Sequence, residues 1–204
     1  ILTTLLTVVF CVKEKWLKMA TTLATVIVII TAFTAPEEII HSLAKMMGDD
    51  GKPLKLEKLI ENKHGFIQVY LNDKNDELVF GGNVYDGMLN TSLTNNHNGI
   101  ERAYLLPVIA PHAKNILVIG LSTASWTRVL TSMPELESMT VIELNPAYPQ
   151  LAGMYPEMQK FLQDKRVNLI TDDGRRWLNK NPEKKFDFIL MNTTFHWRNY
   201  STNL

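Results

Sequence analysis

The residues of this chain that could bind a nucleotide lie where strand-like segments end. Gly120-Leu-Ser-Thr-Ala-Ser125 follows the apolar segment 116–119, with small residues at alternate positions. Small residues let the backbone approach a phosphate or cofactor closely. Glu143 ends the next such segment, 23 residues after Gly120, a spacing at which a carboxylate commonly binds both ribose hydroxyls. The pattern predicts a nucleotide site at Gly120, Ser122 and Glu143, although a plain strand-to-helix turn and a capping acid also explain it.

An acidic pair ends the third apolar segment. Asp172 and Asp173 precede Gly174 there, directly before a helix-like stretch. A carboxylate in this place can accept a hydrogen bond from an adenine amino group. An Asp at a helix start also satisfies free backbone N–H groups, and the two roles are compatible. We expect Asp173 and Gly174 on the adenine side of the site.

The polar segment Asn192-Thr-Thr-Phe-His-Trp197 follows a fourth strand-like segment. Asn, Thr and His side chains can hydrogen-bond a substrate, and Trp can stack on a base or hold a cation. An ordinary polar loop is the alternative interpretation. The other histidines lack the spacing of metal ligands, so no metal is expected.

The elements that position these residues alternate between strand and helix. Short apolar strands separated by helices predict a parallel sheet covered on both faces, an α/β, Rossmann-like fold. Ligands of such sheets bind at the carboxyl ends of the strands. An antiparallel hairpin is expected before this sheet, because two β-branched and aromatic runs flank a polar turn. The expected strands are 116–119, 140–143, 167–171 and 188–191; the helices 100–109, 126–132, 148–162 (broken at Pro156) and 175–179; and the hairpin runs 66–71 and 77–85.

Composition excludes some functions. The 204 residues contain 21 Lys and Arg and 21 Asp and Glu, and this zero net charge argues against a nucleic-acid binder. Cys11 is the single cysteine, so no internal disulfide forms. The chain begins with Ile1 and ends soon after a strand-like segment, which suggests that it was cut from a longer protein.

The amino-terminal region is expected to enter a membrane. Two uncharged runs, 1–12 and 19–36, flank a segment with three lysines and Trp16. This pattern is typical of a helical hairpin in a bilayer, with membrane lipid as its partner. A buried hairpin or a signal peptide are the alternatives. We predict a multi-pass membrane protein whose folded part is cytoplasmic, although the lysine loop alone favours the opposite orientation.

From about His64 to Phe195 the order of these motifs resembles the spermidine synthase (polyamine aminopropyltransferase) family. The family has a small β-hairpin domain before a Rossmann-like domain, and its glycine loop, ribose acid and adenine-side Asp-Gly fall on Gly120–Ser125, Glu143 and Asp173-Gly174. The resemblance implies decarboxylated S-adenosylmethionine, or S-adenosylmethionine, as co-substrate. Some family members carry amino-terminal membrane helices, and a homodimer is one expected assembly.

The resemblance also implies residues on the amine side. The family places an amide that contacts the cofactor after an Asp-Gly, and here Asn90 follows Asp86-Gly87. Of the family's Tyr-His-Glu, only Glu101 is kept, so Asp86 and Glu101 are expected to bind the amine. The family's catalytic Asp is Asn192 here, and an amide cannot accept a proton as a carboxylate can. The glycine loop is crowded as well, since Leu, Thr and Ser interrupt its small residues.

Three functions remain open at this point. Aminopropyl transfer to a small amine is favoured, with methyl transfer from S-adenosylmethionine on the same sheet as a second hypothesis. A catalytically inactive binding module of this fold is the third, because fold alone does not decide function. The expected organisation is a transmembrane region (1–36), a linker helix and loop (37–63), the β-hairpin domain (64–98) and a truncated Rossmann-like domain (99–204).

Overall fold

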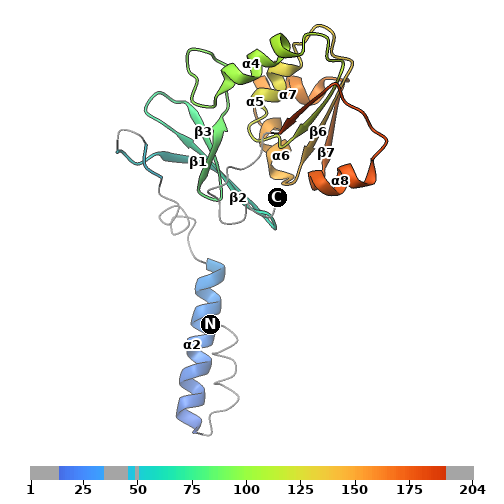
Figure 1. Ribbon diagram of the computed structural model, residues 1–204. Helices are drawn as coiled ribbons and strands as arrows, with labels where there is room; N and C mark the ends of the chain where they lie inside the picture. Colours follow the sequence, from blue (N-terminus) through green and yellow to red (C-terminus); the bar gives the residue numbers. More distant parts are fainter. Residues whose placement is uncertain (1–13, 35–45, 49–50, 192–204) are drawn as a thin grey trace. The chain divides into compact units, whose positions relative to one another are not determined.

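The computed structural model describes residues 14–34, 46–48 and 51–191 (Figure 1). The chain divides into two compact units, Ile1–Lys45 and Met46–Leu204. Residues 37–45 of the expected linker lie outside the described residues, as do the segment 192–197 and the first apolar run, 1–12.

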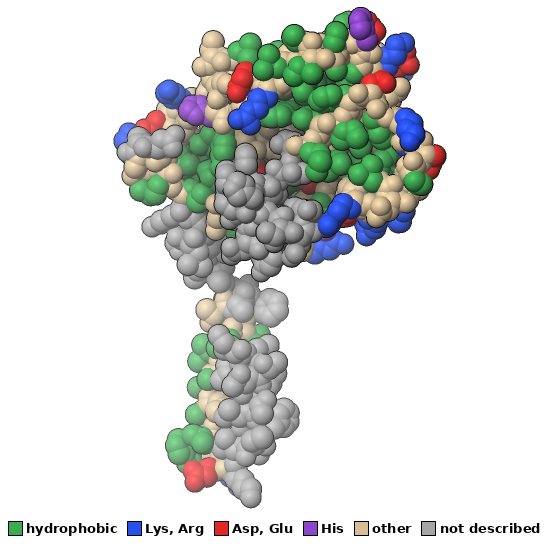
Figure 2. Space-filling model, viewed as in Figure 1, with side chains coloured by type: hydrophobic (Ala, Val, Ile, Leu, Met, Phe, Trp, Pro, Cys, Tyr) green, Lys and Arg blue, Asp and Glu red, His purple; other side chains and the backbone are tan. Residues whose placement is uncertain are grey.

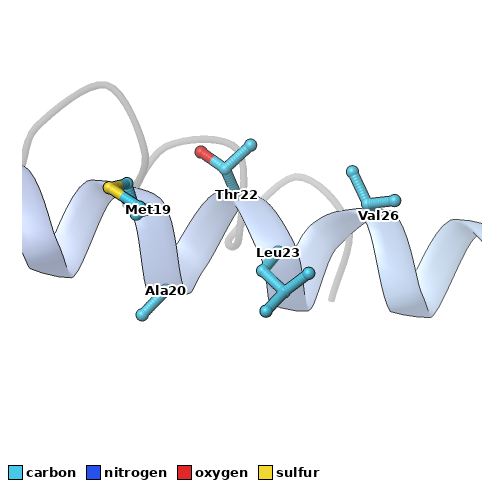
Figure 3. Close-up of a pocket in the computed structure, with 5 residues that line it drawn as sticks. All are labelled: Met19, Ala20, Thr22, Leu23 and Val26. Atoms are coloured by element: carbon cyan, nitrogen blue, oxygen red, sulfur yellow. The ribbon is translucent and has the colours of Figure 1, made fainter.

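The first unit contains helix α2, Lys15–Thr34. Its threonines satisfy their hydroxyls within the helix: Thr21, Thr25 and Thr31 each donate to the carbonyl four residues earlier. A hollow along the helix is lined by Met19, Ala20, Thr22, Leu23 and Val26, none of which is titratable (Figure 3).

The expected multi-pass membrane localisation is not upheld. Among the described residues, no helix is long and apolar enough to cross a bilayer. The sequence of α2 carries two lysines near its start and five threonines, which dilute the apolar character that the run 19–36 suggested.

In the second unit, four antiparallel strands form a small sheet in the order β1-β2-β3-β4. The hairpin predicted from the sequence is confirmed, because Val69 on β2 pairs with Val79 on β3, but the expected second run, 77–85, is divided between β3 and β4. Gly82 and Asn83 then turn the chain with positive φ angles of 57° and 65°, which suits a two-residue hairpin between β3 and β4. The strands are β1 (Lys55–Asn62), β2 (Gly65–Leu71), β3 (Glu77–Gly81) and β4 (Val84–Met88).

The small sheet is larger than the expected hairpin. Lys55–Asn62, assigned to a linker from the sequence, is strand β1. Backbone pairing with β2 makes this segment a strand. The Lys58 ammonium donates to the Tyr155 hydroxyl at 3.1 Å and lies 4.9 Å from the centre of that ring, which adds a long-range contact to a charged strand with a weak apolar pattern. The domain boundaries at 36, 63 and 98 stay predictions.

The second sheet is parallel throughout, in the order β7-β6-β5-β8, as the alternation of strands and helices predicts. Its strands are β5 (Asn115–Ile119), β6 (Ser138–Glu143), β7 (Val167–Thr171) and β8 (Phe188–Met191). The helices are α4 (Ile100–Ile109), α5 (Ser125–Leu130), α6 (Ala147–Gly153), α7 (Pro156–Gln163) and α8 (Gly174–Lys180).

Both faces of this sheet are covered (Figure 1). On one face Ile116 and Val118 of β5 pack with Phe161 of α7, all at most 1% exposed. On the other, Leu117 packs with Trp177 of α8. Alternate residues of one central strand thus serve two cores, as expected for a buried parallel strand. Charged side chains lie on the visible surface around these cores (Figure 2).

Candidate functional site

A cleft of about 880 Å³ lies at the carboxyl ends of the parallel strands. Both sheets contribute to it, since its lining includes Gly81, Asp86 and Gly87 from the small sheet and Glu143 at the end of β6. Six of the predicted site residues line it together: Asp86, Gly120, Ser122, Glu143, Asp173 and Gly174. This volume is in the range of small-molecule sites.

The turn after β5 keeps the backbone of a glycine-rich loop with only one glycine. Gly120, Ser122 and Ala124 have φ angles of 91°, 51° and 63°. Positive φ is easy for glycine and costs other residues about 1–2 kcal/mol. The alternate small residues in the sequence therefore mark positions where the chain visits left-handed conformations.

Hydroxyl groups of this turn hold it against β4. Ser122 Oγ donates to the Asp86 carbonyl at 2.6 Å, and Ser125 Oγ donates to the Met88 carbonyl at 2.8 Å. Gly87 permits this contact, because a Cβ there would lie 3.2 Å from Thr123 Cγ2. Two of the side chains that crowd the loop in sequence, Thr123 and Ser125, thus lie against the small sheet, and the hydroxyl contacts join the two walls of the cleft.

Glu143 stabilises the same turn through hydrogen bonds to backbone N–H groups. Its carboxylate accepts hydrogen bonds from the Leu121 N–H at 2.7 Å and from the Asn145 N–H at 2.8 Å. The side chain is only 6% exposed. Burial raises the pKa of Glu143, while the surrounding backbone N–H groups oppose this shift by favouring the ionised form. A carboxylate offers about four lone-pair sites, so these two hydrogen bonds leave some of its acceptor capacity.

The acidic pair after β7 begins helix α8. Asp173 is the N-cap, and its side chain accepts from the Arg176 N–H at 2.8 Å. Asp172 pairs with the Arg176 side chain, whose hydrogen bond lowers the pKa of that carboxyl. Gly174 has a packing role, because a Cβ there would lie 2.8 Å from Ile119 Cγ2. The capping interpretation of Asp173 is confirmed, and a contact with adenine stays a prediction.

On the opposite wall, Asp86 accepts a hydrogen bond from the Tyr148 hydroxyl. Tyr148 comes from α6 and is 9% exposed. A Cβ at Gly81 would collide with both the Asp86 carboxylate and the Tyr148 hydroxyl, so the missing side chain of Gly81 makes room for the pair. The sequence did not identify Tyr148 as a site residue. Its one indication was its place in the chain, shortly after the end of β6.

Two predicted residues do not line the cleft. Asn90 accepts from the Ser92 N–H at 3.0 Å and so shapes the loop before α4. Glu101 accepts a hydrogen bond from the Asn96 side chain and lies beside Arg102. Asn192 is outside the described residues.

The loop before α4 nevertheless contributes His97, Asn98 and Gly99 to the lining of the cleft. Trp126 donates its indole N–H to the Asn98 carbonyl at 3.0 Å, and the Tyr85 hydroxyl donates to the His97 carbonyl at 3.0 Å. Arg102 also lines this end of the cleft. His97 and Asn98 were missed because the polar run 91–99 gave no periodic signal.

Sequence comparison finds polyamine aminopropyltransferases. The chain is 29% identical over 144 residues to that of Thioalkalivibrio sulfidiphilus, covering 68% of this chain and 49% of the relative. It is 29% identical over 85 residues to that of Clostridium botulinum and 31% identical over 85 residues to that of Clostridium perfringens, each covering 41% of this chain and 30% of the relative. The chain thus spans between about a third and a half of these relatives. No family model matches it.

Solved structures of spermidine synthases share the fold. A spermidine synthase in complex with the transition state analogue AdoDATO aligns with a TM-score of 0.58 and 16% identity, over 69% of this chain and 47% of that one. The enzyme of Thermotoga maritima aligns with a TM-score of 0.59 and 15% identity, over 70% and 50%. The relatives and the fold together confirm the predicted resemblance to the spermidine synthase family.

Proposed function

We propose that this chain carries the adenosyl-binding part of an aminopropyltransferase that moves an aminopropyl group from decarboxylated S-adenosylmethionine to a small amine. The observation that carries the proposal is the convergence of the Gly120 turn, Glu143 and Asp173 on one cleft, at the strand ends where such sheets bind ligands. The sequence relatives named polyamine aminopropyltransferase support the same activity.

In this proposal each wall of the cleft has its own task. Glu143 accepts hydrogen bonds from the ribose hydroxyls with the lone pairs that its backbone partners leave. Asp173 receives the adenine amino group, and the backbone at Gly120, Ser122 and Gly174 lies against the adenosyl group. The amine binds on the Asp86 side, with Asn90, Glu101 and Asn192 as further proposed contacts. Alignment of the two substrates provides most of the rate enhancement.

One alternative is favoured by a specific residue. Asn192 stands at the position of the family's catalytic Asp, which favours an inactive module that binds the same ligand. Methyl transfer would use the same adenosyl wall and would require no acid on the other side. The presence of Asp86 in the cleft therefore supports an amine acceptor over methyl transfer.

Calorimetric titration with methylthioadenosine, decarboxylated S-adenosylmethionine and S-adenosylmethionine tests the adenosyl site. Glu143→Ala should weaken binding about a hundredfold, because two charge-assisted hydrogen bonds of about 1.5–3 kcal/mol are lost. Glu137→Ala is the matched control, since Glu137 pairs with Lys114 at the opposite end of β6. It should leave the affinity unchanged.

Asp173→Asn refines this test. Asn is as good an N-cap as Asp, so the variant should keep its stability while adenosyl affinity falls about tenfold. Failure of every adenosyl compound to bind refutes the proposal. Unchanged affinity in Glu143→Ala refutes the assignment of this residue. Turnover is measured as methylthioadenosine release with putrescine: binding without turnover establishes the inactive module, and methylated product establishes methyl transfer.

A further inference from the structure

Aminopropyl transfer requires a group that accepts a proton. An acceptor amine is an ammonium ion at neutral pH, and its nitrogen has no lone pair for attack until a proton leaves. A side-chain amide such as that of Asn192 cannot take this proton. If the proposed function holds, another group must accept the proton, and a carboxylate of the cleft can do so.

Among the described residues, four carboxylates line the cleft, and three of them lie at the strand ends that form the proposed adenosyl wall. Glu143 accepts two backbone N–H groups, Asp173 caps α8, and Asp172 pairs with Arg176. The carboxylate of Asp86 is the fourth, and it comes from the small sheet on the other wall.

The surroundings of Asp86 hold its carboxylate in a defined position. Tyr148 donates its hydroxyl hydrogen to Asp86 Oδ2, and the space beside Gly81 accommodates both groups. The main chain at the same residue is held as well, because the Asp86 carbonyl accepts from Ser122 Oγ at 2.6 Å. Tyr148 of α6 thus holds the Asp86 side chain, and Ser122 of the adenosyl-side turn holds the Asp86 backbone. The same residue is therefore held by contacts from both proposed substrate sides of the cleft.

We propose that Asp86, oriented by Tyr148, receives the acceptor amine and takes the proton that the amine loses; this inference rests on the proposed aminopropyl transfer. The ammonium N–H bond breaks and the proton passes to Asp86. The nitrogen lone pair then forms a bond to the methylene carbon next to the sulfonium. The carbon–sulfur bond breaks with its electron pair going to sulfur, which leaves methylthioadenosine and a secondary ammonium product. Asp86 finally releases the proton to solvent.

Tyr148 acts as a positioning residue in this scheme. A hydrogen bond donated to a carboxylate favours its ionised form. Tyr148 therefore keeps Asp86 ready to accept a proton and fixes which of its oxygens faces α6. Loss of the hydroxyl should change the pH at which the carboxylate becomes protonated, an effect that a purely structural contact would not produce.

The experiment uses Asp86→Asn and Tyr148→Phe, with Asp73→Asn as control because Asp73 is an exposed carboxylate paired with Lys52. In Asp86→Asn the new amide oxygen can still accept from Tyr148, so the cleft should keep its shape. Putrescine is titrated into the free protein and into the methylthioadenosine complex, and transfer is followed as methylthioadenosine release. Asp86→Asn should weaken putrescine binding at least tenfold and lower kcat by a factor of about 10²–10⁴, with methylthioadenosine affinity within twofold of wild type.

For Tyr148→Phe we expect the acid limb of the kcat profile to move to higher pH, with rates at alkaline pH within a few fold of wild type. Asp86→Asn with wild-type kcat or wild-type putrescine affinity overturns the inference, as does an equal loss of methylthioadenosine binding. Failure of the proposed function differs, because the wild-type protein itself then shows no methylthioadenosine binding or no transfer.

Discussion

The close approach of Gly174 to Ile119 predicts that Gly174→Ala destabilises the wild type but stabilises an Ile119→Ala variant. Gly174 is the first residue of α8, and a Cβ placed there would lie 2.8 Å from Ile119 Cγ2 on β5. Heavy atoms at this distance must move apart, and Cγ2 is attached to the β-branched Cβ of Ile119, whose χ1 angle is stiff. We expect Gly174→Ala to destabilise the fold by about 1–3 kcal/mol, the usual range for overpacking.

Removal of the opposing group should reverse the effect. Gly174 has no positive φ, so alanine suits its backbone and reduces the entropy of the unfolded chain by about 0.4–1 kcal/mol. In an Ile119→Ala background the clash is absent, and Gly174→Ala should then stabilise the protein by about this amount. The coupling energy between the two sites should therefore be at least about 1.5 kcal/mol, well above the 0.3–0.5 kcal/mol found for independent sites.

Urea unfolding measures all four members of this cycle, and the fluorescence of the buried Trp177 on α8 reports on the relevant contact. Equal destabilisation by Gly174→Ala in both backgrounds would refute the packing role of this glycine. An effect on adenosyl affinity with no change in stability would instead favour the ligand role that the sequence suggested.

Two further predictions concern the cleft. Burial raises the pKa of Glu143, so methylthioadenosine affinity should fall as the pH drops through that raised pKa. The fall should occur at a less acidic pH than an exposed Glu would give. In Glu143→Gln the affinity measured by calorimetry should not change over the same pH range. The folded state favours the protonated acid, so the free energy of unfolding of the wild type minus that of Glu143→Gln should increase over the same fall in pH; a decrease of this difference in urea titrations would contradict the prediction. Gly87→Ala should cost more stability than Gly51→Ala, at about 1–3 kcal/mol, because both have positive φ but only Gly87 lies against Thr123. Equal midpoints in urea would show that this contact carries no strain.

The parallel sheet could be predicted because its signal is local. Segment 116–119 is uniformly apolar, and a uniformly apolar strand is expected to be buried on both faces, as β5 is. Helix α4 was predicted at 100–109, because its signal also lies within the segment itself. Strand β1 was missed because its charged residues, Lys58 among them, give the segment a weak apolar pattern.

The site was predictable only where strand ends determine it. Glu143 and Asp173 follow strands of one parallel sheet, so their loops meet at one edge whatever their side chains do. Asn90 and Glu101 were inferred from motif order alone, and the structure turns them towards their own loop. Tyr148 could not be inferred, because its contact with Asp86 depends on how α6 packs beside the small sheet.

The hydroxyl contacts between the Ser122 turn and β4 bear on how freely this cleft can change during evolution. Both hydroxyls bond to main-chain carbonyls, those of Asp86 and Met88. Every residue type has such a carbonyl, so the attachment does not depend on which side chain β4 presents at either position. Mutations can therefore alter the chemistry of this wall while the two sheets stay joined, and the acceptor side of the cleft can diversify faster than the frame that supports it.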